Sequence, residues 1–386
     1  MNNPIKLITT LLGFLLLELT CFATPYKISI HKENGLYFAT NISINNIPIN
    51  GRFLIDTGTE VSVINSSIVE LTNLSYKKKV TKYADGTNMQ QIIVGEAVLN
   101  ISLGELVTPK HKVDIWDNNN LDIVSVPNIV GIIGGDILRK YICKLTESSL
   151  YITTKLSDFS NIDEFSKLNI IYKDNPFIEV KFGLPIATSL FDTGYNGFLE
   201  VNNMFLDYIP IVNSIEGMGV VAKTILTKDT CCKAIKVEEF KIGNFSIKDP
   251  VAFVSNDKIW SIGTEFFNYF ETIFDFPKKK MYLKQISKNF TSSHFYTYGF
   301  KFDYQDSDII ISFLWNNSSA EENGIKLGDK ILTLNNFDIK KLLQNKSKCE
   351  ISSLIRTELN KEFLDITIKD ASNKIKAYHL TKQKII

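Results

Sequence analysis

The chain has 386 residues, of which 44% are hydrophobic and 22% charged, and 43 basic residues nearly balance 42 acidic ones. This length exceeds one ordinary hydrophobic core and predicts two or three domains of a globular protein. The net charge of +1 excludes a large basic surface for binding nucleic acid or an anionic membrane, so we expect no nucleic-acid partner.

The N-terminus predicts an export signal. A basic residue precedes the apolar stretch LITTLLGFLLLEL, and small residues suited to cleavage follow, ending at Ala23. The stretch is short for a membrane-spanning helix, and no second long apolar run occurs. We therefore predict a signal peptide over residues 1–23 and a periplasmic or secreted mature protein. Leu19 and Thr20 fit poorly before a lipid-modified cysteine, which disfavours the alternative of a lipoprotein anchored through Cys21.

Cysteines and histidines give no sign of a metal site. The cysteines left after the signal are too few for a disulfide scaffold, and the adjacent Cys231 and Cys232 are badly placed to bond to each other. One of them pairs elsewhere, or they are buried free thiols; both alternatives stay open. The histidines are isolated in the sequence, without ligand spacing, so we expect no metal and no organic cofactor. These residues are Cys143, Cys231, Cys232 and Cys349, and His31, His111, His294 and His379.

Most of the mature chain alternates short apolar runs with turn residues, which predicts a mostly all-β fold. Two lysine runs, 77–79 and 278–280, are expected at solvated turns. We expect strands over residues 26–30, 36–45, 51–56, 91–95, 98–103, 177–183 and 185–192.

The tripeptide Asp-Thr-Gly occurs twice, at residues 56–58 in FLIDTGTEVSVI and at residues 192–194 in SLFDTGYNGFLEV. One copy alone indicates only a turn. Here, however, both copies follow an apolar strand and precede another apolar run. At a similar distance downstream, IIGGDIL with Gly134 matches SIGTEFF with Gly263, which indicates an internal repeat.

The repeat predicts two homologous β lobes, an N-terminal one over residues 24–156 and a C-terminal one over residues 157–288. After residue 290 the pattern changes, and the sequence from there has no counterpart in either lobe. We therefore predict a separate small domain over residues 289–386.

A pseudo-two-fold axis between the lobes would bring the carboxyls of Asp56 and Asp192 together. Glycine after each Asp-Thr pair lets the backbone double back, and each threonine hydroxyl can reach the opposite turn. Two carboxyls in contact cannot both ionise easily, so they share one proton and titrate as a pair. The ionised member can activate a water, while the protonated one polarises a peptide carbonyl. The supporting residues are Thr57, Gly58, Thr193, Gly194, Gly134 and Gly263.

With these motifs the chain resembles the aspartic proteases, most of all the retropepsin-like bacterial type, over most of residues 36–287. The resemblance implies two acid-protease β-barrel lobes and an endopeptidase acting on peptide or protein substrates. It implies that Asp56 and Asp192 are catalytic within one chain, so we expect a monomer. It also implies a hairpin over the cleft, for which Tyr83, Asp85 and Gly86 are candidates, although an ordinary surface hairpin fits them equally well.

One position departs from the family pattern, in which a small residue or threonine follows Asp-Thr-Gly. Thr59 fits and can hydrogen-bond Asp56, whereas Tyr195 does not fit. A bulky ring beside Asp192 is expected to fill part of the cleft or to tilt the carboxylate. The alternative function is therefore a catalytically weak or inactive peptide-binding protein on a protease scaffold.

GMGVVA, residues 217–222, matches the form of a dinucleotide-binding loop, but polar residues precede it where a parallel strand is required. In the repeat it falls at the second lobe's counterpart of the flap, so we do not expect a nucleotide site.

The C-terminal segment SSAEENGIKLGDKILTLNN, residues 318–336, resembles part of a PDZ domain. A short helix is expected from Ala320 to Asn323, ended by Gly324, and then a strand over residues 330–334. The resemblance implies a peptide-carboxylate loop at Tyr298, Gly299 and Phe300, which would bind a C-terminal peptide. A module that only packs against the lobes, or binds the chain's own tail, fits equally well.

Overall fold

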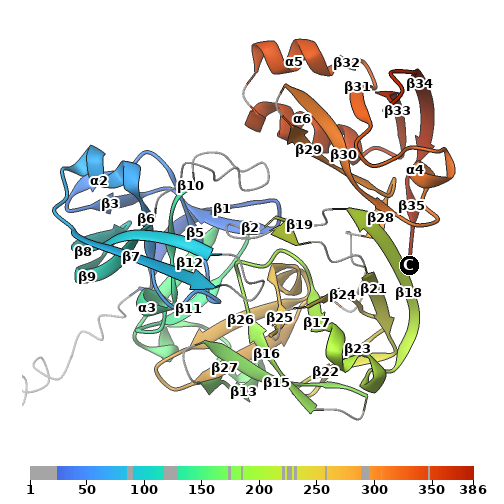
Figure 1. The fold of residues 1–386 in the computed structure, drawn as a ribbon. Helices are drawn as coiled ribbons and strands as arrows, with labels where there is room; N and C mark the ends of the chain where they lie inside the picture. Colours follow the sequence, from blue (N-terminus) through green and yellow to red (C-terminus); the bar gives the residue numbers. More distant parts are fainter. Residues whose placement is uncertain are drawn as a thin grey trace, which may run out of the picture.

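The fold is mostly β, as the alternating sequence pattern predicts. The described strands of a computed structural model form two large sheets of 15 and 16 strands (Figure 1). Among the described residues no helix is both long and apolar enough to cross a membrane, and the predicted signal peptide lies outside them. The structure describes residues 24–84, 90–116, 129–172, 175–183, 186–219, 222–223, 228–229, 233–256, 259–287, 295–305, 307–346 and 348–386.

The first lobe comprises the strands and short helices up to Thr153. Its helix α2 begins after Asn65, whose side chain accepts a hydrogen bond from the Ser67 amide and so caps the helix. The elements are β1 (Tyr26–Glu33), β2 (Leu36–Ala39), β3 (Ile42–Ile44), β4 (Ile47–Pro48), β5 (Arg52–Ile55), β6 (Val63–Asn65), α2 (Ser66–Thr72), β7 (Lys77–Ala84), β8 (Gln90–Leu103), β9 (Leu106–Trp116), β10 (Ile129–Ile133), α3 (Gly135–Leu138), β11 (Ile142–Leu145) and β12 (Ser149–Thr153).

The second lobe follows two short 3-10 turns, η1 (Leu156–Asp158) and η2 (Ile162–Glu164). Its elements are β13 (Ser166–Asn169), β14 (Ile171–Tyr172), β15 (Pro176–Phe182), β16 (Ile186–Phe191), β17 (Leu199–Asn202), η3 (Asn203–Tyr208), β18 (Ile211–Gly219), β19 (Ala222–Lys223), β20 (Lys228–Asp229), β21 (Lys233–Val237), β22 (Glu239–Ile242), β23 (Phe245–Lys248), β24 (Val251–Ser255), β25 (Trp260–Ile262), η4 (Thr264–Asn268), β26 (Phe270–Asp275) and β27 (Lys280–Gln285).

The two lobes repeat one strand arrangement. In the first, β5 runs parallel to β10, which pairs antiparallel with β6, and β6 runs parallel to β9. In the second, β16, β25, β17 and β24 pair in the same order and with the same directions. The repeat inferred from the sequence therefore has a matching duplication in the strand pairing.

A sheet shared by both lobes joins them. Its strands follow the order β1, β12, β11, β26, β27 and β13, with the crossing from one lobe to the other at the antiparallel pair β11–β26. One hydrophobic cluster includes buried side chains of both lobes, among them Ile152 and Leu283. Because the lobes share this sheet and core, their relative position is set by the same packing that stabilises each of them.

Several local expectations need correction. The strand expected over residues 36–45 is divided into β2 and β3, whereas the two expected over 91–95 and 98–103 form one strand, β8. Lys77–Lys79 begin β7 and do not lie at a turn; their charge is compensated because Glu96 on the paired strand β8 forms ion pairs with Lys77 and Lys79. The turn expected near residues 278–280 is present between β26 and β27.

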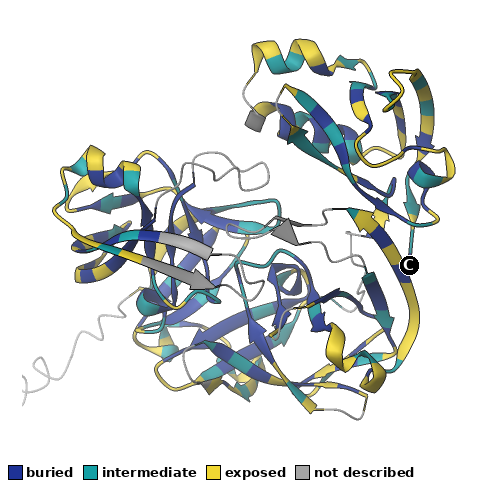
Figure 2. Ribbon diagram, viewed as in Figure 1, coloured by how far each residue is buried: buried dark blue, intermediate teal, exposed yellow. Residues whose placement is uncertain are grey.

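The C-terminal module, residues 295–386, has a hydrophobic cluster of its own (Figure 2). The expected short helix is α4, begun by Ser318 and followed by Asn323 and Gly324, and the expected strand over residues 330–334 is β31. The elements are β28 (Tyr296–Thr297), β29 (Phe300–Gln305), β30 (Asp308–Trp315), α4 (Ser319–Glu322), β31 (Lys330–Leu334), β32 (Phe337–Asp338), α5 (Ile339–Asn345), α6 (Lys348–Leu359), β33 (Phe363–Lys369), β34 (Ile375–Thr381) and β35 (Gln383–Lys384).

Candidate active site

Each Asp-Thr-Gly tripeptide begins where a buried strand ends. Asp56 follows β5 and its amide donates to the carbonyl of Ile133 at 3.0 Å. Asp192 follows β16 and its amide donates to the carbonyl of Ile262 at 2.9 Å. The two aspartates thus occupy equivalent positions, each held by the strand that precedes the supporting glycine of its own lobe.

The threonines bond each loop to the other. Thr57 Oγ1 donates to the carbonyl of Phe191 at 2.6 Å and accepts from the Thr193 amide at 3.1 Å. Thr193 Oγ1 donates to the carbonyl of Ile55 at 2.7 Å and accepts from the Thr57 amide at 2.9 Å. Both side chains are buried, so each hydroxyl satisfies two backbone groups that water does not reach.

The glycines let the two carboxyls approach. A Cβ at Gly58 would lie 2.5 Å from Cγ of Asp192, and one at Gly194 would lie 2.6 Å from Oδ2 of Asp56. Real Cβ atoms do not come so close to a carboxyl. Each loop therefore presents a bare backbone to the carboxyl of the opposite loop.

The carboxyls of Asp56 and Asp192 lie close together, each against the glycine of the opposite loop. Although part of the Asp192 side chain reaches solvent, the surrounding protein desolvates its carboxyl. This desolvation, reinforced by the charge of Asp56, raises the pKa of Asp192 well above its usual value, and the Gly194 amide opposes the shift only in part. The raised pKa favours the protonated form of Asp192.

The two carboxyls differ in their hydrogen bonds. Asp56 Oδ1 accepts from the amides of Gly58 at 2.8 Å and Thr59 at 3.0 Å, and its Oδ2 accepts from the Thr59 hydroxyl at 2.7 Å. Asp192 Oδ1 accepts from the Gly194 amide at 2.7 Å. Asp56 thus accepts three hydrogen bonds from its own loop, whereas Asp192 accepts one.

Tyr195, at the position that corresponds to Thr59, turns back along its own loop. Its hydroxyl donates to the carbonyl of Leu199 at 3.2 Å, and its ring lies against Gly263, where a Cβ would come within 2.5 Å of Cδ1. The Tyr195 hydroxyl therefore donates its hydrogen bond to the backbone that follows its own loop. Gly263 has no side chain and leaves room for the Tyr195 ring. The ring therefore fits without tilting the Asp192 carboxylate.

The supporting glycines lie behind the loops in matched positions. The Gly134 amide donates to Ser62 Oγ at 2.9 Å, and the Gly263 amide donates to the carbonyl of Phe198 at 3.1 Å. A Cβ at Gly134 would lie 2.9 Å from the backbone of Val61, so this strand passes close to the loop, as the sequence predicted.

Sequence reasoning missed a polar network behind the first loop. Ser62 donates to Asp136 through its hydroxyl at 2.6 Å and its amide at 2.9 Å, and His111 Nε2 lies 2.8 Å from the same carboxyl. Burial acts to raise the pKa of Asp136, but the bonds from His111 and Ser62 together lower it. Because Ser62 also accepts from Gly134, the network braces the loop. The only sequence signal is Asp136 beside the repeated glycine.

The histidines that are isolated in the sequence are not all isolated in space. Besides contacting Asp136, His111 lies with its Nδ1 3.2 Å from Lys140 Nζ, and His379 Nδ1 lies 2.7 Å from Asp365 Oδ1. His294 lies outside the described residues.

The flap candidates are only partly described. Tyr83 is in β7, where its backbone pairs with Gln91 of β8, so the expected hairpin strands are present. Asp85 and Gly86 lie outside the described residues.

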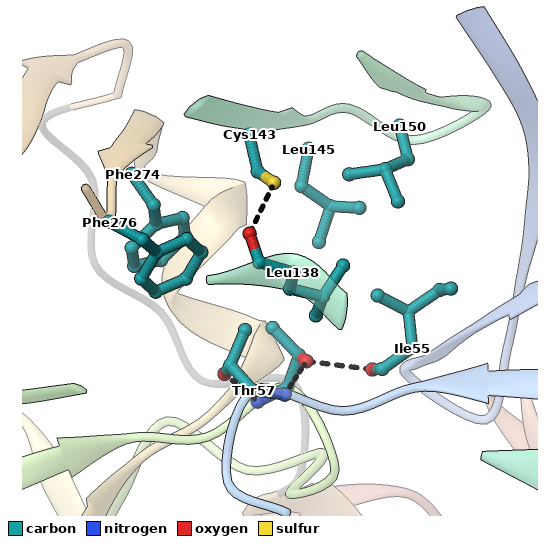
Figure 3. Close-up of a pocket in the computed structure, with 9 residues that line it drawn as sticks. Ile55, Thr57, Leu138, Cys143, Leu145, Leu150, Phe274 and Phe276 are labelled. Carbon is teal, nitrogen blue, oxygen red and sulfur yellow. Dashed lines mark hydrogen bonds between the residues drawn. The ribbon is translucent and has the colours of Figure 1, made fainter. Parts of the chain in front are cut away.

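A small cavity of about 10 Å³ lies against Thr57 and Thr193 (Figure 3). Leu138, Leu145, Phe274 and Cys143 help to line it, and Cys143 Sγ lies 3.6 Å from the carbonyl of Leu138. The apolar lining offers a water few partners. The cavity is therefore a packing gap under the loops and does not accommodate a substrate.

Burial raises the pKa of the Cys143 thiol, which predicts that this cysteine is inert in the native protein. We expect iodoacetamide to alkylate it at least roughly 10²-fold more slowly at neutral pH than in concentrated urea. Peptide mapping by mass spectrometry resolves Cys143 from the other cysteines. Equal rates in both conditions would contradict the buried, protonated thiol.

The candidate peptide-carboxylate loop at residues 298–300 is anchored in the core of the C-terminal module. Gly299 has a φ of +95°. Its carbonyl accepts from the Trp315 amide at 2.8 Å, and its amide donates to Thr297 Oγ1 at 3.2 Å. Tyr298 and Phe300 on either side are buried in the core of the module.

The segment that resembles a dinucleotide loop begins in β18, which pairs antiparallel with β21 and β30. Among the described residues, both strand partners of β18 are antiparallel, whereas a dinucleotide loop follows a parallel strand.

No protein-family model matches the sequence, and a search among curated proteins returns no significant match. Function is therefore inferred from residue chemistry and geometry. The central feature is a pair of closely placed carboxyls from two lobes, held by threonines that cross between their loops.

Proposed function

We propose that the protein is an exported aspartic endopeptidase that hydrolyses peptide bonds by activating a water between Asp56 and Asp192. The observation that carries the proposal is the pair of closely placed carboxyls with its crossed threonines. Two carboxyls with different environments can supply a base and an acid at the same place. No covalent intermediate is needed.

In the proposed reaction, the water lies between the carboxyls and faces the scissile peptide carbonyl. Asp56, ionised, takes a proton from the water while the water oxygen bonds to the carbonyl carbon. Asp192, protonated, gives its proton to the carbonyl oxygen, which forms a tetrahedral gem-diol. Collapse of this intermediate breaks the carbon–nitrogen bond. The proton held by Asp56 goes to the leaving nitrogen, and a gem-diol hydroxyl returns a proton to Asp192.

The alternative proposal is a peptide-binding protein without catalysis. Tyr195 favours it, because Asp192 has no threonine hydroxyl from its own loop where Asp56 has that of Thr59. Incubating the purified mature protein with a mixed peptide library distinguishes the two. The peptidase proposal expects cleavage that an Asp56→Asn variant lacks. Binding without cleavage at any pH from acidic to neutral supports the alternative.

Tyr195→Thr tests how Asp192 carries the proton. A threonine hydroxyl that donates to Asp192 favours its charged form and lowers its pKa. The alkaline limb of kcat/KM against pH should therefore move down by about one unit. Tyr195→Phe, which adds no donor to the carboxyl, should leave the limb in place. A limb unmoved in both variants would contradict the assigned protonation.

We propose that the C-terminal module is PDZ-like. Supporting features are the Gly299 loop, the short helix α4, and the strand β29 beside helix α6, where Tyr304 Oη lies 2.7 Å from Ser352 Oγ. A peptide end would add as a strand along β29. The chain's own tail already pairs nearby, since β35 lies antiparallel to β28. Binding of a labelled C-terminal peptide, measured by fluorescence anisotropy, tests the proposal.

A further inference from the structure

The sheet of the second lobe continues into the C-terminal module. From the loop that carries Asp192, hydrogen-bonded strands follow in the order β17, β24, β21, β18 and β30. The β18–β30 interface pairs Gly217–Gly219 antiparallel with Phe313–Trp315. The amide of Asn316 adds a bond to the carbonyl of Glu216 at 2.9 Å. The two bodies are thus joined by backbone hydrogen bonds as well as by the covalent chain.

Glycines in β18 are what allow this contact. A Cβ at Gly217 would lie 2.3 Å from Cζ of Phe313, and a Cβ at Gly219 would lie 2.2 Å from the carbonyl oxygen of Ser312. Gly219 also has a φ of +104°, which side-chain-bearing residues rarely adopt. Met218 between them keeps half of its side chain exposed. The spacing of the two glycines therefore serves the close approach of β30.

An aromatic cluster closes the same interface. Trp315 lies with its ring centroid 6.2 Å from that of Phe253 in the second lobe, and 6.0 Å and 4.9 Å from those of Phe295 and Phe313. Ile386 at the end of the chain is buried in this cluster. Buried aromatic contacts of this kind are typical of a permanent interface, whereas domains that move freely meet through smaller, more polar surfaces.

Among the described strands of the first lobe, β7, which corresponds to β18, has no partner from the C-terminal module. β8 and β21 occupy equivalent places, since each pairs with the strand that runs parallel to β6 or β17. Their outer neighbours are β7 and β18. Among the described strands β7 pairs with β8 alone, whereas β18 pairs with both β21 and β30. Within the part of the chain that the structure describes, strand pairing from outside its lobe therefore reaches only the β18–β21 hairpin of the two.

We propose that the C-terminal module is a fixed part of the second lobe's wall and that it positions β18, the strand of the second lobe that corresponds to β7 of the first. Gly219 and Gly217 are positioning residues in this interface. Disturbing it displaces the hairpin but leaves the Asp56–Asp192 pair and its crossed threonines intact. The kinetic consequence rests on the proposed peptidase function: substrate binding weakens while the chemical step does not.

The test compares Gly219→Ala, Gly217→Ala and the control Met218→Ala in the full mature chain. Hydrogen exchange by mass spectrometry should show residues 211–219 and 308–315 exchanging about tenfold faster in Gly219→Ala. Gly217→Ala should change less, since its clash is with a ring that can move, and Met218→Ala should match the wild type. Peptides covering β5 and β16 should exchange at the wild-type rate in all three.

Steady-state kinetics on a fluorogenic peptide distinguish a positioning role of these glycines from a purely structural one. We expect Gly219→Ala to raise KM roughly fivefold with kcat within about twofold of the wild type. The control Met218→Ala should leave both parameters unchanged. If Gly219→Ala does not fold, Gly217→Ala carries the same comparison.

Two results overturn the inference while leaving the peptidase intact: wild-type exchange of residues 211–219 in both glycine variants, or faster exchange with an unchanged KM. If the wild type cleaves nothing, the peptidase proposal fails instead. The exchange data then decide the inference separately. They are combined with anisotropy measurements of binding of a labelled form of the fluorogenic peptide to the wild type and variants.

Discussion

Replacing either aspartate of the pair by asparagine should abolish hydrolysis, with kcat/KM falling by roughly 10² to 10⁴-fold or more. Asp56→Asn removes the base that takes the water's proton, and Asp192→Asn removes the acid that protonates the carbonyl oxygen. Assay of both variants with the wild type on one fluorogenic peptide, across acidic to neutral pH, measures the loss. Activity retained by either variant would exclude the proposed mechanism.

The same two substitutions should change stability in opposite directions. The raised pKa of Asp192 means that the native state keeps a proton which the unfolded chain releases at its ordinary, lower pKa. Wild-type stability therefore falls as pH rises from that ordinary value towards the native pKa. Asparagine imitates the protonated carboxyl and does not titrate. Asp192→Asn should accordingly be more stable than the wild type at neutral pH, and the difference should vanish at low pH.

Asp56→Asn should instead destabilise the protein at neutral pH. The bonds from Gly58 and Thr59 now end on a carboxylate, and a neutral amide accepts them less strongly. The expected cost is about 1–3 kcal/mol. Thermal unfolding of both variants over a pH series checks the pair of predictions. Equal effects at the two positions would contradict the assignment of the proton to Asp192.

The features that the sequence predicted correctly are those that depend on short, local residue patterns. Asp-Thr-Gly after an apolar strand fixes a buried strand that ends in a tight turn, and two copies at similar spacing from Gly134 and Gly263 indicate a duplicated lobe. Strand β31 followed from apolar residues after a glycine-containing turn. Such patterns succeed because strand ends and turns depend mainly on neighbouring residues.

What the sequence did not predict depends on contacts between distant segments. His111, Asp136 and Ser62 come from β9, α3 and the loop before β6, and no spacing rule joins them. The turning of Tyr195 along its own loop depends on the room left by Gly263. Gly217 and Gly219 imitate a nucleotide motif, but their close contact is with β30, almost a hundred residues later.

The crossed threonines lead to the second large effect, on stability. Thr57→Val keeps the shape of the side chain but leaves the carbonyl of Phe191 without its donor and the amide of Thr193 without its acceptor. Each unsatisfied buried group costs about 1–3 kcal/mol, so the variant, with two such groups, should lose about 2–6 kcal/mol. Thr57→Ser keeps the hydroxyl and loses one methyl group, which should cost about 1 kcal/mol.

Because the C-terminal module has its own core, whole-chain unfolding need not be a single transition. Pulsed hydrogen exchange over a urea series, read on peptides covering β5 and β16, isolates the lobes that the threonines join. Thr193→Val should behave as Thr57→Val does, since the bonds are matched across the pseudo-two-fold axis. The double variant should lose less than the sum of the two single losses, because each substitution already loosens the same loop contact. If the urea midpoint of Thr57→Val equals that of Thr57→Ser, the crossed hydrogen bonds do not hold the loops together. The close approach of the carboxyls would then need another cause.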